Sequence, residues 1–393
     1  MAKILYVVTH MPCPPVMGAH HRVLNIARRL RQCGEVTMVY AGRSCSAASL
    51  AATRKEFGEI VLLHPRFIEG RDPISRFRYK FDYHCPWHCA YQVPRQEKHR
   101  FAQLRREHDL VWFHTLPAAD CFGVQKWERS VMDLDDLNHI KFKWKSGIDR
   151  GIRLKIANGL LVYKWQRRER RSLDRFSLVT VCSNYDKNVL SGGQRIHVIP
   201  NGFASPPEEP SRQAPQHLRL GLIGNLAYGP NADGLKWFSR EIWPLITRKV
   251  PQAQLRIVGN LPEELDGLMK PGYEKLGFLE NTGAEFAGWS ALVVPLRYGG
   301  GTRLKIVEAL SKKCPIVSTS IGAHGLDLSH GKDILLADQP QVFASSCIKL
   351  LQDADYGKKL AEAGWSTFRE KYTWDVIGET IKKVVNECVT LPV

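Results

Sequence analysis

Short apolar runs alternate with segments of helical periodicity along most of the chain. The first apolar run, residues 3–9, is followed by a loop rich in proline and glycine at 11–18. A helical pattern then begins near His21 and places four apolar residues on one face: Val23, Ile26, Ala27 and Leu30. A second apolar run follows at 35–40, and strand, helix, strand is the repeating unit of a parallel sheet.

Further apolar runs predict the remaining strands of a first α/β domain. They cover residues 59–63, 110–114, 130–134, 178–182 and 195–199. Residues 201–217 are polar and contain four prolines, which is the composition of a linker.

After this linker the alternation starts again. Strands are predicted at 218–223, 254–258, 292–295 and 315–319, and helices at 233–249, 302–312, 341–352 and from residue 375. The sequence therefore predicts two successive Rossmann-like domains, residues 1–200 and 218–375. A C-terminal helix at 376–393 follows, and it can pack back on the first domain.

Composition and cysteine usage are those of a folded protein in a reducing compartment. The 393 residues are 44% hydrophobic and 24% charged, and the ten cysteines follow no regular spacing. The first apolar run is too short for a secretory signal, and none reaches the roughly 20 residues of a spanning helix. We therefore expect free thiols and a cytoplasmic location.

The positive charge lies almost wholly in the first half of the chain. Residues 1–200 contain 34 Lys and Arg against 18 Asp and Glu, whereas the remainder contains 22 against 21. A field of this kind attracts polyanions or anionic membrane surfaces.

Residues 139–175 are the most basic segment, with 12 Lys and Arg against 3 Asp and Glu. Ile152, Ile156, Leu160 and Tyr163 recur at helical spacing, with tryptophans between the cations. This pattern fits a helix lying on an anionic bilayer and equally a packed helix with a solvated basic face. A shorter basic and aromatic stretch lies at 76–80. We expect no nucleic-acid partner, because no recognised binding module is present.

The densest chemical signal is the segment VVPLRYGGGTRLKIVEAL at 293–310. A strand ends there, and Gly299, Gly300, Gly301 and Thr302 lead into a helix, so backbone N–H groups can approach an anion closely. Arg303 and Lys305 are expected in the first helical turn, where cations disfavour the helix itself and suggest a diphosphate ligand. Glu308, one turn further on, can accept hydrogen bonds from a ribose. A flexible turn with a surface Lys–Glu pair is the alternative interpretation.

Residues 293–326, which extend this segment by SKKCPIVSTSIGAHGL, resemble the donor-site signature of family-four glycosyltransferases. The branch is the one with a GGGTRLK loop, of the kind found in bacterial polysaccharide synthesis. Segments at 199–203, 222–238, 251–260 and 372–377 resemble the same family in the same order. The resemblance implies a GT-B fold, in which two Rossmann-like domains with parallel sheets face each other across a cleft.

The resemblance also implies an activity: transfer of a hexose from a nucleotide-diphosphate sugar, with retention and without a metal or other cofactor. The diphosphate would lie on residues 299–302 and the helix start, and the ribose on Glu308. The family's first glutamate falls at Gly300, so the donor sugar is not specified. Asn225 and Asn231 stand where the family has an arginine and a lysine, which leaves Arg303 and Lys305 to supply charge to the phosphates.

In the first domain, Gly18 lies in a loop that resembles the family's acceptor-side glycine loop, and His21 follows it. His20 and Arg22 are interpreted, like His21, mainly as surface residues of the helix start. His114 ends a strand where the family often places a histidine that faces the donor sugar, so it is the catalytic candidate. Three aspartates that end the next strand are interpreted as solvated loop carboxylates: Asp133, Asp135 and Asp136.

Three function classes stay open at this stage. A nucleotide-sugar transferase is favoured, with a lipid-linked or saccharide acceptor and a possible peripheral position on the inner face of the membrane. An epimerase of the same fold and a non-catalytic anion-binding or membrane-binding protein are the alternatives. The segment HCPWHC at 84–89 contains metal-capable side chains, but it lacks a second ligand pair and is interpreted as a packing turn.

Overall fold

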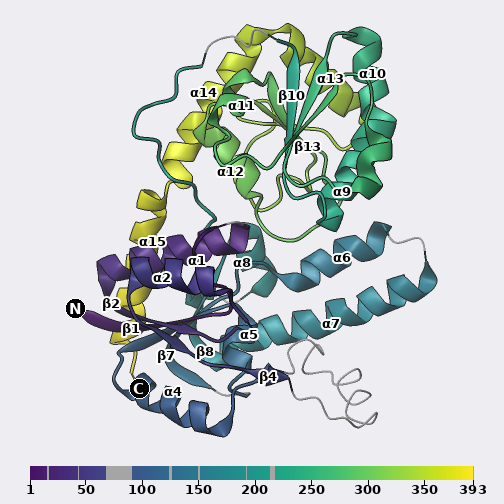
Figure 1. Cartoon of the computed structure of the whole chain (residues 1–393). Coiled ribbons are helices and arrows are strands. Elements are labelled where there is room, and N and C mark those ends of the chain that lie inside the picture. Colours follow the sequence, from purple (N-terminus) through teal and green to yellow (C-terminus); the bar gives the residue numbers. More distant parts are fainter. Residues whose placement is uncertain are drawn as a thin grey trace. The chain divides into compact units, whose positions relative to one another are not determined.

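The computed structural model describes residues 1–15, 17–42, 44–67, 91–123, 126–148, 151–191, 193–212 and 217–392. The segments at 76–80 and 84–89 lie outside the described residues. The chain divides into two compact units (Figure 1). The first consists of Met1–Pro200 together with Ile377–Val393, and the second of Asn201–Val376.

The first unit contains a seven-stranded parallel sheet with the order β3-β2-β1-β6-β7-β8-β9. Its strands are β1 (Ala2–Val8), β2 (Gly34–Tyr40), β3 (Ile60–Leu62), β6 (Leu110–His114), β7 (Trp127–Asp133), β8 (Phe176–Val181) and β9 (Ile196–Val198). The chain runs outward from β1 to β3 and then returns to the other side of β1. The order therefore reverses between β1 and β6, which is the topological switch point of the sheet. A short antiparallel pair, β4 (Arg66–Phe67) and β5 (Tyr91–Gln92), stands apart from this sheet.

Helices complete the first unit. They are α1 (Gly18–Cys33), α2 (Ala47–Phe57), α4 (Arg95–Arg106), α5 (Leu116–Asp120), α6 (Asn138–Ile148), α7 (Ile152–Arg175), α8 (Asn184–Leu190) and α15 (Trp374–Thr390). Helix α1 begins three residues earlier than predicted, and its four predicted apolar residues are all buried. The basic segment at 139–175 forms α6 and α7 rather than one helix.

The second unit contains a six-stranded parallel sheet with the order β12-β11-β10-β13-β14-β15. Its strands are β10 (Arg219–Ile223), β11 (Gln254–Val258), β12 (Tyr273–Gly277), β13 (Ala291–Val294), β14 (Ile316–Ser318) and β15 (Leu335–Leu336). Its α-helices are α9 (Gly229–Trp237), α10 (Trp243–Lys249), α11 (Gly283–Gly288), α12 (Leu304–Ser311), α13 (Pro340–Gln352) and α14 (Ala354–Lys371). A π-helical turn, Phe238–Ile242, joins α9 to α10, where one uninterrupted helix was predicted.

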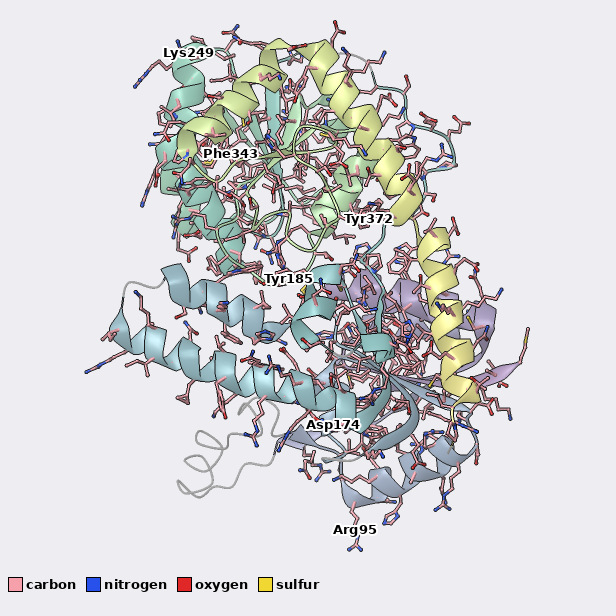
Figure 2. All side chains as sticks on the ribbon, turned by 180° about the vertical axis from the view of Figure 1, so that it is seen from behind. Arg95, Asp174, Tyr185, Lys249, Phe343 and Tyr372 are labelled. Atoms are coloured by element: carbon pink, nitrogen blue, oxygen red, sulfur yellow. The ribbon has the colours of Figure 1, made fainter. Side chains whose placement is uncertain are left out.

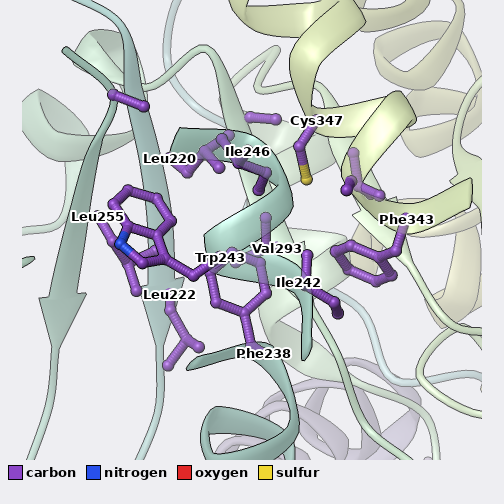
Figure 3. Packing of buried hydrophobic residues seen from close by; sticks show 14 of the residues in the cluster. Leu220, Leu222, Phe238, Ile242, Trp243, Ile246, Leu255, Val293, Phe343 and Cys347 are labelled. Atoms are coloured by element: carbon purple, nitrogen blue, oxygen red, sulfur yellow. The ribbon is translucent and has the colours of Figure 1, made fainter. Parts of the chain in front are cut away.

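One face of the second sheet packs against α10, α13 and the π-helical turn. Figure 3 shows Leu220 and Leu222 of β10 and Leu255 of β11 among the side chains that meet there. Phe238 and Phe343 approach edge to face, with ring centroids 6.1 Å apart. Burying side chains of this size contributes about 1.5–3 kcal/mol each, so this layer fixes the strand ends that carry the loops described next.

The proline-rich segment after residue 200 lies along the second unit in its described part. Phe203 pairs with Thr373, and the Arg212 Nη2 atom donates a hydrogen bond to the carbonyl of Trp289 at 2.5 Å. Residues 213–216 lie outside the described residues.

None of the helices in the described part of the chain combines the length and the apolar character needed to span a membrane. The eight described cysteines are all free thiols.

Candidate functional site

Two loops of the second unit meet at the switch point of its sheet. Because β10 lies next to β13, the loop after β10 and the loop after β13 leave neighbouring strands at the same edge. Gly224 follows β10, and the three glycines at 299–301 follow β13. Ligands of open parallel sheets bind at this position.

Lys305 links the two loops. Its ammonium group donates a hydrogen bond to Asn231 Oδ1 at 3.0 Å, and Asn231 Nδ2 donates to the Asn225 carbonyl at 2.8 Å. Gly224 has φ +146°, and a Cβ atom there would lie 2.8 Å from the Lys305 Nζ atom. Glycine at position 224 therefore leaves the space that the ammonium group occupies. The Asn225 side chain itself accepts from the Ala227 N–H at 3.0 Å and shapes the turn of this loop.

The ammonium group of Lys305 is held where its charge is poorly compensated. Burial and, to a smaller extent, the neighbouring Arg303 guanidinium together lower the pKa of Lys305 to about 7. An arriving anion would restore the charge, because an opposite charge close by favours the protonated amine.

The glycine loop is held by Arg303. The Arg303 Nη1 atom donates to the carbonyls of Gly300 and Gly301, the second at 2.9 Å. The left-handed backbone falls at Gly299 (φ +131°) and Gly301 (φ +76°). A Cβ atom at position 299 would also lie 2.8 Å from Arg303 Nη2, so glycine is required there. The prediction that Arg303 lies in the first helical turn is wrong: the helix begins at Leu304, and the extended Arg303 folds back over the loop.

Glu308 lies further along α12 and is oriented by a neighbour. Its Oε1 atom accepts a hydrogen bond from the Thr282 hydroxyl at 2.5 Å, and burial raises the pKa of Glu308. Thr302, at the end of the glycine loop, accepts from Asn201 Nδ2 at 2.9 Å. His324 lies near Arg303, and burial together with that positive charge lowers the pKa of His324 to about 4.

The structure thus brings most of the predicted donor residues into one connected set. Arg303 contacts Gly300 and Gly301, and Lys305 reaches the loop of Asn225. Sequence reasoning missed Gly224, Thr282 and His324. Of these, only Gly224 had a local signal, as a glycine directly after a predicted strand. The binding roles of the set stay predictions.

In the first unit, His114 ends β6 and is fully buried. Its Nδ1 atom lies 3.0 Å from Asp133 Oδ2, and the two residues are register partners on β6 and β7. Asp133 also accepts from Arg22 Nη2 at 2.6 Å, from Arg22 Nε at 2.9 Å and from the Thr180 hydroxyl at 2.8 Å. The interpretation of Arg22 as a surface residue and of Asp133 as a solvated carboxylate is therefore wrong. Both are fully enclosed and form a buried ion pair.

This ion pair fixes the proton on His114. Burial by itself would raise the pKa of Asp133, but the Arg22 charge and the hydrogen bonds from His114 and Arg22 hold it well below the usual range. An ionised carboxylate only accepts, so His114 Nδ1–H donates the hydrogen bond to Asp133. The Nε2 atom is buried, and within the described residues it has no hydrogen-bond partner.

His114 also lies at the switch point of the first sheet. His10 follows β1 and His20 lies in the first turn of α1, with their ring centroids 6.0 Å apart. Burial lowers the pKa of His10 to about 4, and the nearby His114 and His20 act in the same direction. Gly18 begins α1 with open space around its Cα, and the half-buried His21 follows in the same turn. The acceptor-side roles of Gly18 and His21 stay predictions.

Three possible metal ligands meet beyond Asp133: Asp135, Asp136 and Cys182 have ligand atoms within 4.8 Å of one another. The Cys182 thiol donates to Asp135 Oδ1 at 3.1 Å, and burial raises the pKa of Cys182 well above its usual value. A protonated thiol is a poor metal ligand. The expectation of a site without metal stays a prediction.

One family model and a known relative match parts of the chain. Residues 217–353 match the family model of glycosyl transferases group 1. An uncharacterized 44.6 kDa protein in the cps region of Klebsiella pneumoniae is 28% identical over 167 residues, which is 38% of this chain and 42% of that protein. The match with this curated relative therefore spans less than half of either protein.

Solved structures match over almost the full chain. The Anabaena HepE protein in complex with UDP and glucose has a TM-score of 0.65 at 14% identity, covering 98% of this chain and 100% of that one. Sucrose-phosphate synthase from Thermosynechococcus elongatus has a TM-score of 0.70 at 13% identity, covering 98% of both chains. The chain has the GT-B fold. Residues 217–353, which match the group 1 family model, lie within the second unit of this fold.

Proposed function

We propose that the chain is a hexosyltransferase that takes its sugar from a nucleotide-diphosphate donor. The observation that carries this proposal is the Lys305 ammonium group. Asn231 holds it over Gly224, next to the glycine loop and at the switch point of the second sheet. Burial and the Arg303 guanidinium are the causes of its lowered pKa, and an anion bound beside it would offset both.

The diphosphate and the ribose of the donor each have a matching group in this unit. The diphosphate would lie against the backbone N–H groups of residues 299–302 and the start of α12, with Lys305 supplying charge. Glu308, oriented by Thr282, would accept hydrogen bonds from the ribose. Donors aimed at the departing diphosphate stabilise the charge that develops as the glycosidic bond breaks.

His114 is the proposed contact to the donor sugar from the first unit. Its buried Nε2 lone pair can accept a hydrogen bond from a sugar hydroxyl, while Asp133 keeps the proton on Nδ1. Retention of configuration and independence of a metal are part of the proposal and rest on the resemblance of residues 293–326. The anomeric configuration of the product by NMR and activity in the presence of a chelator test them.

The proposed acceptor is a lipid-linked or saccharide molecule at an anionic membrane surface. The excess of basic residues in the first half of the chain supports this proposal. A relative encoded in a cps region supports a saccharide product.

The test is release of nucleotide from a panel of nucleotide sugars, beginning with UDP-glucose because HepE was solved with UDP and glucose. Lys305→Ala should raise the donor KM more than about tenfold, since it removes a charge-assisted contact to the diphosphate. The matched control is Lys358→Ala, an exposed lysine on α14, which should leave KM unchanged. No release from any donor, or an unchanged KM in Lys305→Ala, would contradict the proposal.

A further inference from the structure

Helices α6 and α7 form a hairpin that extends beyond the sheet of the first unit (Figure 1). Its inner side is anchored in the core. Trp165 belongs to the buried core cluster of this unit, and Phe142, Trp144 and Leu161 pack against that cluster. Figure 2 shows Asp174 at the end of α7 that lies next to the sheet, with side chains standing out along the rest of the helix. The anchored inner side holds the hairpin in place and leaves another face of α7 outward.

The outward face of α7 is apolar in its first three turns. Ile152, Ile156 and Leu160 are spaced by four residues and are 71%, 62% and 42% exposed. Tyr163 continues the same stripe and is 50% exposed. Residues at this spacing lie on one face of a helix, so these side chains form a continuous apolar strip. Scattered single apolar residues need no explanation, but an aligned exposed strip marks an interaction surface.

The same face turns basic further along the helix. Arg167 and Arg170 follow Tyr163 at the same helical spacing, and both are exposed. Exposed Arg153 and Lys155 flank the apolar strip. Lys143 and Lys145 on α6 are also exposed. Of the three acidic residues in this segment, Glu169 is buried against His139 and so offsets little of the surface charge.

We propose that the α6–α7 hairpin is a membrane anchor that lies on an anionic bilayer. The strip of Ile152, Ile156 and Leu160 enters the boundary between headgroups and acyl chains, and Arg167 and Arg170 bind the anionic headgroups. Apolar residues on one face and cations beside them are the composition of an interfacial helix, which buries its apolar face about 5–10 Å deep. This inference adds a membrane-binding surface to the proposed function. It rests on the proposed membrane acceptor only for the reason why the protein would bind a membrane.

A bilayer fits this face better than a second copy or a nucleic acid. A two-fold dimer through the face would bring two surfaces of the same positive charge together. Nucleic-acid surfaces place aromatic side chains between the cations for base stacking, whereas three aliphatic side chains lead this strip. An anionic bilayer complements the positive charge of this face and also takes up its exposed aliphatic side chains.

The experiment is flotation of the full-length protein with phosphatidylcholine vesicles, with and without phosphatidylglycerol. Ile152→Asp/Ile156→Asp should lower the vesicle-bound fraction at least about tenfold, because each change removes apolar burial and adds a charge of the same sign as the lipid. Arg167→Gln/Arg170→Gln should remove the preference for phosphatidylglycerol. The matched controls are Phe278→Asp/Val342→Asp and Lys358→Gln/Lys359→Gln, which change exposed residues of the second unit and should bind as the unaltered protein does.

Nucleotide release in vesicle-free solution is measured on the same proteins. Unchanged release in the hairpin variants shows that they are folded and separates this inference from the proposed activity. The inference is overturned if the unaltered protein does not float with anionic vesicles, or if the isoleucine variants float as well as the controls do. Loss of a dimer in the isoleucine variants without loss of flotation assigns the face to a second copy. If the arginine variants lose bound nucleic acid and the isoleucine variants do not, the face is assigned to nucleic acid.

Discussion

At the end of β6, one carboxylate determines what His114 can offer a ligand. Asp133 is surrounded by donors from Arg22, Thr180 and His114, so it stays ionised although it is buried. The ionised carboxylate accepts the hydrogen bond from His114 Nδ1, which leaves Nε2 as the ring atom proposed to meet a sugar hydroxyl. Asp133 is therefore a positioning residue, and His114 is the group proposed to touch substrate.

Single substitutions of Asp133 and His114 should have different effects on stability and on activity. Asp133→Asn removes the carboxylate nearest to the buried Arg22 and leaves Asp135, 3.4 Å from Arg22 Nε, to offset its charge. It should lower the free energy of unfolding of the first unit by up to about 3–5 kcal/mol. His114→Ala keeps the Arg22–Asp133 pair and should lower kcat with a much smaller loss of stability. Denaturant unfolding of both variants, together with donor kinetics, checks this. Equal loss of stability in the two variants would contradict it.

The same ion pair predicts an acid-dependent stability. The folded-state pKa of Asp133 lies below its unfolded value, so its contribution is complete above the usual carboxyl range and is lost as the pH falls through that range and below. The difference in unfolding free energy between the unaltered protein and Asp133→Asn should therefore shrink steadily below about pH 4. A difference that does not change with pH would show that Asp133 is not ionised in the folded state.

The functional roles of His114, Lys305 and the glycine loop stay predictions. The sequence alone was enough to place His114 and the glycine loop at or after strand ends of a parallel sheet, where ligands of such sheets bind. It was not enough for Arg22 and Asp133, which are 111 positions apart and meet only through the fold. Without that contact, a charged residue at a helix start or strand end is most simply interpreted as solvated.

Helix α12 places a lysine where a helix least favours one. Lys305 lies in its first turn, where the helix dipole and the Arg303 guanidinium both oppose a second positive charge. The protein tolerates this arrangement because the ammonium group has Asn231 as its acceptor. A group held with a depressed pKa should respond strongly to an anion that binds beside it.

Donor binding should accordingly take up a proton at Lys305. The free protein has the pKa of Lys305 near 7, and a bound diphosphate would raise it, so the neutral amine must be protonated on binding above that pH. Affinity for the nucleoside diphosphate should fall with rising pH above 7, by up to about tenfold per pH unit. Calorimetry in buffers of different ionisation enthalpy measures the uptake. Lys305→Ala should bind weakly with no such dependence, and an unaltered pH profile in that variant would contradict the assignment.

The elements that the sequence predicted well are those with a strong apolar signal. Residues 110–114 and 254–258 were predicted as strands with the bounds that the structure shows, because both are continuous apolar or alternating runs. Strand β12 was missed because YEKLG has little apolar character, and β15 because it has only two residues. The long helix α14 was missed as well, since glycines at 357 and 364 interrupt its helical pattern. Gly364 is needed there, as a Cβ atom would lie 2.8 Å from Leu310 Cδ2.

At the scale of the whole chain, the first unit is completed by residues from the far end of the sequence. Helix α15 begins in the second unit and continues into the first, where Ile381, Val384, Val385 and Cys388 are buried. The His197 Nε2 atom lies 3.2 Å from Glu387 Oε2 of this helix. The second unit, by contrast, is a single continuous stretch, Asn201–Val376, and contains every residue proposed to bind the diphosphate and the ribose of the donor.

A chain that ends at residue 376 should therefore lose one unit and keep the other. Burial of the four α15 side chains contributes about 1.5–3 kcal/mol for each isoleucine or valine, which is comparable to the whole stability of a small domain at about 5–15 kcal/mol. The first unit should lose its cooperative unfolding and all transfer activity. The second unit should still bind the nucleoside diphosphate with the affinity and the Lys305 dependence of the full chain, because its sheet, its core and both loops are intact. Calorimetric titration and thermal unfolding of the shortened chain measure these outcomes, and loss of nucleotide binding would show that the donor site is not contained in the second unit.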